Sequence, residues 1–314
     1  MSEYNFLQID DHSYKSIKEL YWRSFKLKTR LEEIKNKYDT SGFGLKNIGY
    51  LAKDSSGDLA AYYGVFPIRM SLMGKDILAA QSADTMTAPE HRKKGLFTLL
   101  AKKTYEKAAE TGIRFVFGFP NDNSLPGFQR NLHWKFYGIM KTWKFSNKTL
   151  PVSELASRFR IILPLYQIYS RIRLKKYSVE MTQSNVEHLS DKKVNGQVKK
   201  DVHFVQYKTS NQNVHFIRMN GFFFLIKPIP HLNIGCFSNI EEEKTDLFLN
   251  TIKQLGMKLG CGKTVLTLSD NHWLYERLKS KVSFTDSLPI GYFEIDPNIP
   301  YKEITYVGAD YDTF

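Results

Sequence analysis

The segment Gln81–Phe97, QSADTMTAPEHRKKGLF, contains the signals that decide the fold. An apolar, strand-like stretch ends near Thr87, and after Gly95 the apolar residues recur at helical spacing. The pattern predicts a strand, a turn over Arg92–Gly95 and a helix. Such a connection gathers free backbone N–H groups at the positive end of a helix dipole, where a pyrophosphate can bind. The side chains that add positive charge there are Arg92, Lys93 and Lys94.

Further strands and helices are predicted on both sides of this segment. Two glycine-containing turns, Ser55–Asp58 and Met73–Lys75, separate three strand-like stretches, which indicates antiparallel hairpins. A compact apolar strand follows the central helix. The predicted elements of this part of the chain are strands at 4–8, 48–52, 60–73, 76–87, 113–119 and 134–145, and helices at 14–28, 29–38, 96–111 and 125–132.

A polar, proline-containing stretch at 146–151 predicts a domain boundary, which gives domains 1–148 and 149–314. The second half opens with a basic linker helix and then repeats the order of hairpin strands, helix, strand, helix and strand. The predicted fold class is therefore α/β, a mixed and largely antiparallel sheet flanked by helices, with a second domain of the same kind. Its predicted elements are helices at 154–176, 242–259 and 271–279, and strands at 203–207, 214–219, 222–226, 263–269 and 291–295.

Composition limits the classes of protein to consider. The 314 residues suffice for about two domains, and 45 Lys plus Arg against 32 Asp plus Glu give a net charge of +13. This balance favours a polyanionic partner such as a phosphate-rich cofactor, a nucleic acid or an anionic membrane. The two cysteines form no disulfide framework or zinc motif, so we expect no metal and a cytoplasmic location. We also expect no signal peptide and no membrane span.

The central segment resembles the acyl-CoA signature of the GNAT acetyltransferase superfamily. Arg92 and Gly95 match the signature Gln/Arg-x-x-Gly-x-Gly/Ala, whereas Phe97 stands where a second small residue is usual. The combination with Asp84–Thr87 and Gly118–Asn123 is similar to a bacterial subgroup related to the Eis-like acetyltransferases, which carry two GNAT-type domains. The resemblance is specific over about residues 45–145 and concerns only the architecture beyond them.

The resemblance implies transfer of an acetyl group from acetyl-CoA to a primary amine. Backbone groups of Met86 and Thr87 would polarise the thioester carbonyl, and the amides of Arg92–Phe97 would bind the pyrophosphate. Asn121 and Asn123 are either turn residues or amides that hold substrate or pantetheine. The implied cofactor-binding residues are Met86, Thr87, Arg92, Lys93, Lys94, Gly95, Leu96, Phe97, Asn121 and Asn123.

The proton-transfer groups are less well defined. Gln81 stands where many relatives have a glutamate base, and Asp84 is the nearest carboxylate, either as base or as an anchor for the strand. The Eis-like group is understood to use its C-terminal carboxylate, and this chain also ends in phenylalanine, Phe314. The family's proton-donating tyrosine falls near Gln129, so Tyr137, His133 or a water would have to replace it.

Several alternatives stay open from sequence. The acceptor is a small-molecule amine, with amino sugars, polyamines and peptide amines as candidates. The chain could instead be a non-catalytic module that binds CoA or an anion, or a transferase that takes its group from aminoacyl-tRNA. No recognised nucleic-acid motif occurs. The basic, apolar stretch 157–176 is either a packed linker helix or a helix that contacts an anionic membrane.

Overall fold

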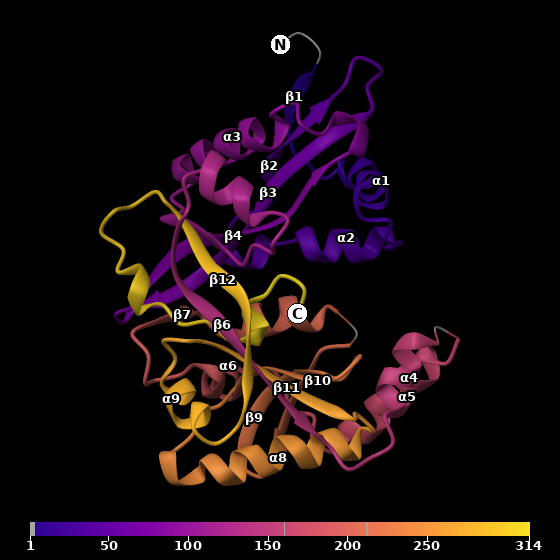
Figure 1. Cartoon of the computed structure of the whole chain (residues 1–314), viewed down its shortest axis with the longest axis vertical. Coiled ribbons are helices and arrows are strands. Elements are labelled where there is room, and N and C mark those ends of the chain that lie inside the picture. The colour runs from indigo at the N-terminus through magenta and orange to yellow at the C-terminus, as the bar shows by residue number, and fades with distance from the viewer. Residues whose placement is uncertain (1–3, 160, 212) are drawn as a thin grey trace. The chain divides into compact units, whose positions relative to one another are not determined.

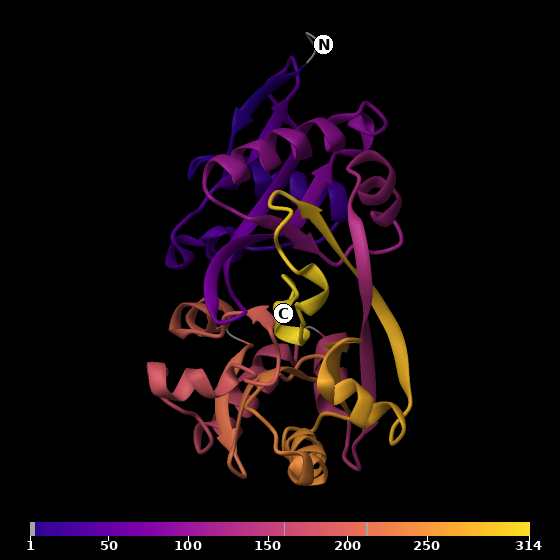
Figure 2. The same ribbon diagram turned by 90° about the vertical axis from the view of Figure 1, so that its left-hand side faces the viewer.

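The computed structural model describes residues 4–159, 161–211 and 213–314. The chain divides into two units (Figures 1 and 2). Unit 1 comprises Met1–Met70, Lys75–Tyr137 and Pro289–Tyr301, and unit 2 comprises Ser71–Gly74, Gly138–Leu288 and Lys302–Phe314. The chain thus changes unit more than once, and the expected boundary after residue 148 lies inside unit 2.

The strands of unit 1 form a mixed sheet. They pair in the order β1 (Asn5–Gln8), β2 (Ile48–Lys53), β3 (Leu59–Leu72), β4 (Lys75–Thr87), β5 (Phe115–Gly118) and the end of β12 (Phe284–Glu294). β1, β2 and β3 are antiparallel, β4 and β5 are parallel, and β12 is antiparallel to β5. The return of β12 explains why Pro289–Tyr301 belongs to unit 1.

Two hydrophobic clusters lie on the two faces of this sheet, because side chains alternate along β3. Tyr63 packs in the cluster of α3 (Leu96–Glu110), in which Leu100 is fully buried. Tyr62 packs in the cluster of α1 (Tyr14–Phe25) and α2 (Leu31–Tyr38). Figure 1 shows α3 and the α1–α2 pair on different sides of the strands. β4 and α3 thus pack in one cluster, and the turn that the sequence predicted joins them.

Unit 2 repeats the arrangement of a strand, a helix and a parallel strand. Its strands pair in the order β6 (Lys135–Ser146), β11 (Lys263–Ser269), β10 (Leu232–Phe237), β9 (Phe222–Lys227) and β8 (His215–Met219). β10 and β11 are parallel and are joined through α8 (Thr245–Lys258), while the other pairs are antiparallel. The remaining elements include α4 (Val152–Arg158), α5 (Leu163–Lys175), α6 (Gln183–Val186), β7 (Gly196–Val198), α7 (Val202–Thr209) and α9 (Trp273–Lys279).

The predicted fold class is confirmed, but one expected strand is wrong. Residues 203–207 lie in helix α7, not in a strand. The Asp201 side chain accepts a hydrogen bond from the Phe204 N–H at 2.9 Å and caps the helix, and Phe204, Val205 and Lys208 form its buried side. Strand β10 was not predicted, and the helix expected over 154–176 is two helices. In the described part of the chain, no helix has the length and apolarity needed to cross a bilayer.

Candidate functional site

The turn between β4 and α3 brings the end of the strand back to the start of the helix. A short 3-10 helix, Pro89–His91, follows β4, and the Arg92 Nε donates a hydrogen bond to the Thr87 carbonyl at 3.4 Å. Lys93 and Gly95 then adopt left-handed conformations, with φ of 64° and 76°. Glycine takes this conformation at little cost, and Gly95 is the N-cap of α3.

The pairing of β4 with β5 stops before β4 ends. The parallel register joins Ala80 to Val116 and Gln81 to Phe117, whereas β4 continues to Thr87. Asp84 lies in this continuation with a φ of 52°, a left-handed conformation that interrupts the regular strand. Beyond Gln81, β4 therefore no longer pairs with β5 and continues toward the start of α3.

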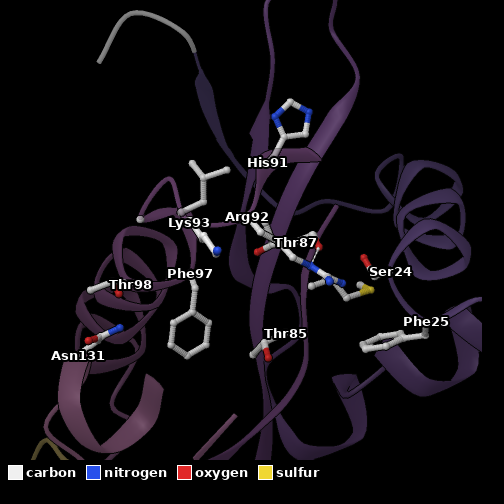
Figure 3. Close-up of a pocket in the computed structure, with 13 residues that line it drawn as sticks. Ser24, Phe25, Thr85, Thr87, His91, Arg92, Lys93, Phe97, Thr98 and Asn131 are labelled. Atoms are coloured by element: carbon white, nitrogen blue, oxygen red, sulfur yellow. Dashed lines mark hydrogen bonds between the residues drawn. The ribbon is translucent and has the colours of Figure 1, made fainter. Parts of the chain in front are cut away.

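A pocket of about 380 Å³ lies where the end of β4 faces the first turn of α3 (Figure 3). Its size falls in the range of small-molecule sites, roughly 300–1,000 Å³. Residues from α1, β4, the turn and α3 contribute to its wall, and all belong to unit 1. The lining residues are Ser24, Phe25, Thr85, Met86, Thr87, His91, Arg92, Lys93, Gly95, Leu96, Phe97, Thr98 and Asn131.

One part of this pocket has the cations and hydrogen-bond donors that bind an anionic group. The side chains of Arg92 and Lys93 line it, and the first N–H groups of α3 have no partner within the helix. Gly95 has no side chain with which to cap them. The Ser24 Oγ is buried and has no hydrogen-bond partner among the described residues, so it offers a further donor. Backbone amides, cations and a hydroxyl together suit a phosphate oxygen.

Another part of the wall is aromatic. The Phe97 ring packs edge-on against Tyr63 and Phe128, with centroid distances of 5.6 and 5.4 Å. A β-carbon at Gly127 would lie 3.1 Å from the Phe97 ring, so the small residue at 127 makes room for it. In Figure 3 Phe97 and Phe25 lie on opposite sides of the pocket, on α3 and α1. The site therefore offers both a cationic and an apolar surface.

The predicted binding residues divide into two groups. Lys94 is outside the lining, and its Nζ lies 5.6 Å from the centroid of the Tyr4 ring. Asn121 and Asn123 are exposed, and the Asn121 Oδ1 accepts hydrogen bonds of 3.1 Å from the backbone N–H groups of Asn123 and Ser124, as in an Asx turn. The predicted residues that do line the pocket are Met86, Thr87, Arg92, Lys93, Gly95, Leu96 and Phe97.

The three predicted catalytic residues have different surroundings. The Asp84 Oδ1 accepts a hydrogen bond from the Lys37 Nζ at 2.8 Å. Tyr137 is half-buried on β6, and its ring centroid lies 5.9 Å from that of Tyr292. Phe314 belongs to unit 2. In the part of the chain that the structure describes, none of the three lines the pocket.

Sequence reasoning did not find several of the lining residues. Thr85 and Thr98 adjoin predicted residues, so their neighbours were a usable signal. Ser24 and Phe25 come from the end of α1, far away along the chain, and only the packing of α1 brings them to β4. Tyr4 holds His91 by a hydrogen bond of 2.9 Å between its hydroxyl and the His91 Nδ1. The residues that the sequence did not single out are Ser24, Phe25, Thr85, His91, Thr98 and Asn131.

Comparison with known proteins agrees with this geometry. Residues 6–137 match the family model of the acetyltransferase (GNAT) domain, and this range contains the whole pocket. A search of curated protein sequences finds no match.

The fold is similar to those of solved acetyltransferases. A GCN5-related N-acetyltransferase from Kribbella flavida matches with a TM-score of 0.57 and 13% identity, over 94% of this chain and 71% of that protein. A GCN5-related N-acetyltransferase from Anabaena variabilis matches with a TM-score of 0.54 and 11% identity, over 93% of this chain and 73% of that protein. At this identity the likeness concerns the fold. It agrees with the match of residues 6–137 to the model of the GNAT acetyltransferase domain.

Proposed function

We propose that the protein transfers an acetyl group from acetyl-CoA to a primary amine of a small molecule. One observation carries the proposal: the pocket at the start of α3 combines phosphate-binding donors with the end of β4 beyond its pairing with β5, inside the range that matches the GNAT domain. In this proposal the N–H groups of Gly95–Thr98, with Arg92 and Lys93, hold the pyrophosphate. The Ser24 hydroxyl donates a further hydrogen bond, because it has no partner among the described residues.

The end of β4 is proposed to hold the acyl end of the cosubstrate. Thr85, Met86 and Thr87 line the pocket beyond the last register pair of β4 with β5. Backbone N–H groups there would stabilise the negative charge that develops on the thioester oxygen when the amine attacks the carbonyl carbon. The attacking nitrogen loses a proton and the departing CoA sulfur gains one, so a base and an acid are required.

Three groups remain as proposals for these proton transfers. The first is Asp84, which would act as a base although it forms an ion pair with Lys37. Tyr137 and the carboxylate of Phe314 are the other two, and the structure places neither among the described residues of the pocket lining. The variants Asp84→Asn and Tyr137→Phe, and a chain extended by one glycine beyond Phe314, separate the three, since each changes one group and keeps the rest of its side chain or ring.

The acceptor is proposed to be neutral or phosphorylated, for example an amino sugar. The net charge of +13 and the cations at the pocket oppose the approach of a polyamine. We also propose that the chain belongs to the tandem, Eis-like subgroup. The support is architectural: β10, α8 and parallel β11 repeat β4, α3 and parallel β5, and β10 has a register shift between Ile234 and Cys236.

Calorimetry with acetyl-CoA tests the cofactor site. Arg92→Glu should weaken binding by at least about tenfold, since it replaces a phosphate-binding cation by an anion. Lys102→Glu is the matched control, because it makes a similar charge change at an exposed position of the same helix outside the pocket lining. Equal affinity in wild type and Arg92→Glu would remove the proposed phosphate site.

Release of free thiol in the presence of a panel of amines tests the reaction. Turnover with neutral or phosphorylated amino sugars is the expected result. Binding of CoA without thiol release across the panel would favour a non-catalytic module. Binding of transfer RNA without binding of CoA would favour transfer from aminoacyl-tRNA.

A further inference from the structure

Helix α5 in unit 2 carries an apolar stripe on its exposed side. Leu165, Ile168 and Ile172 follow the i, i+3, i+7 spacing of one helix face, and these residues are 66%, 53% and 68% exposed. Ile161, in the turn before the helix, is 87% exposed. An exposed apolar run of this kind is unusual in a soluble protein unless it contacts something. We call these four residues the α5 stripe.

The α5 stripe is not needed to hold the helix in place. Tyr166, Ser170 and Leu174 form the buried side of α5, and Leu174 belongs to the hydrophobic cluster of unit 2. The Tyr166 hydroxyl donates a hydrogen bond of 2.9 Å to the Leu259 carbonyl. α5 thus has two apolar sides, one that attaches it to its own unit and one that faces outward. Figure 1 shows α5 on the outside of unit 2.

Positive charge surrounds this stripe on both sides. From the helical spacing of 100° per residue, Arg171 and Lys175 flank one edge of the stripe, and Arg173 and Lys176 flank the other. The sequence contains no Asp or Glu from residue 155 to residue 179. Among the described residues, the four cations have no carboxylate partner. Long basic side chains beside an apolar stripe can extend their charged ends to an anionic surface.

We propose that the α5 stripe and its cations bind the surface of an anionic lipid bilayer. The apolar side chains would enter the boundary between head groups and acyl chains, while the cations contact lipid phosphates. A second copy of the chain fits less well, because face-to-face packing of two α5 helices would bring like charges together. α5 is about 20 Å long, so it would lie along the membrane plane. The proposal is independent of the acetyl-CoA site in unit 1.

Sedimentation of the full chain with vesicles tests this surface. The vesicles contain phosphatidylcholine alone, or phosphatidylcholine with about one-third phosphatidylglycerol. The protein is expected to bind the anionic vesicles. Its binding to the neutral vesicles should be weaker by at least about tenfold, and its binding to the anionic vesicles should weaken as salt is raised, because salt screens the lipid phosphates.

Two double variants separate the apolar and the charged contributions. Ile168→Gln with Ile172→Gln, and Arg171→Gln with Arg173→Gln, should each weaken binding to anionic vesicles by about tenfold or more. The matched controls are Leu247→Gln, an exposed apolar residue of α8, and Lys15→Gln with Lys18→Gln, exposed cations of α1. The controls should bind as wild type. All variants should keep the wild-type thermal midpoint and acetyl-CoA affinity, which shows that both units are folded.

Three results would overturn the proposal. The first is no binding to anionic vesicles by the wild-type chain. The second is binding that both double variants leave unchanged. The third is self-association of the wild-type chain in sedimentation velocity that the double variant Ile168→Gln with Ile172→Gln loses, while the same variant keeps its binding to vesicles. The α5 stripe would then be an interface between copies of the chain.

Discussion

The carboxylate of Asp84 is paired with the ammonium group of Lys37, with 2.8 Å between Oδ1 and Nζ. The Asp84 side chain is only 8% exposed, and its backbone has the left-handed φ of 52° that interrupts β4. The pair therefore links α2 to the point where β4 leaves the line of β5. This geometry favours an anchoring role for Asp84.

Asp84→Asn should cost stability more than catalysis. Asparagine also tolerates a left-handed conformation, so the backbone is kept while the ion pair is lost. We expect a loss of about 2 kcal/mol in the free energy of unfolding, typical of a hydrogen bond between charged groups. Urea denaturation measures it, and Lys37→Met should give a similar loss. A large fall in kcat for Asp84→Asn, with loss of the acidic limb of the pH–rate profile, would instead make Asp84 the base.

Gly95→Ala should weaken acetyl-CoA binding beyond its effect on stability. Gly95 has a φ of 76°, and a β-carbon there meets no atom within 4 Å, so the cost is the backbone strain of about 1 kcal/mol. Gly57 in the turn between β2 and β3 has a φ of 88° and equally open surroundings. Gly57→Ala is therefore the control: both variants should lose similar stability, and only Gly95→Ala should raise the Kd in calorimetry. Equal Kd values for the two would contradict the close approach of a phosphate at Gly95.

Gly235→Ala should displace the C-terminal phenylalanine. A β-carbon on Gly235 would overlap the ring of Phe314, which packs against this part of β10. The Lys227 Nζ donates a hydrogen bond of 2.8 Å to the Thr313 carbonyl, so the adjacent chain is held as well. Overpacking of this kind costs about 1–3 kcal/mol, which denaturation measures. Adding Phe314→Ala to Gly235→Ala removes the overlap. The double variant should therefore lose less free energy of unfolding than the sum of the losses of the two single variants.

Unfolding should become easier as the pH falls from 6.5 toward 4, and His272 is one cause. Burial lowers the pKa of His272 to about 4, although the nearby Asp191 carboxylate opposes the shift. The Nδ1 accepts a hydrogen bond from the Leu274 N–H at 3.2 Å, which a doubly protonated ring cannot do. In this pH window the unfolded chain binds a proton that the folded chain does not. Stability is therefore full above pH 6.5 and decreases as the pH falls, by up to about 3 kcal/mol.

His272→Asn isolates this contribution. An asparagine oxygen can still cap α9, so the helix start is kept while the titrating group is removed. Urea denaturation at several pH values should give a smaller loss of stability between pH 6.5 and 4 for the variant than for wild type. His203→Asn changes an exposed histidine and should retain the wild-type dependence. Identical curves for wild type and His272→Asn would contradict the assignment.

The elements around the site were predictable because their signals are local. The alternation of β4, Pro89 after it, Gly95 and the apolar spacing of α3 all act within a few residues of one another. The sequence misled at 203–207, where β-branched and aromatic residues favour a strand. There the Asp201 cap and the buried side of α7 outweigh the local preference. β10 contains Asn233 and Gly235, which are weak strand formers, and its pairing with β9 and β11 makes it a strand.

The sequence by itself determined that a strand end, a basic turn and a helix start would meet near Gly95. Tertiary structure alone decided what surrounds that point: α1 supplies Ser24 and Phe25, and Lys37 pairs with Asp84. It also decided which side of α5 is buried. The physical reason is range, because backbone conformation follows from interactions between near neighbours in the chain. The lining of a pocket and the exposure of a helix face depend on packing between segments that are distant in sequence.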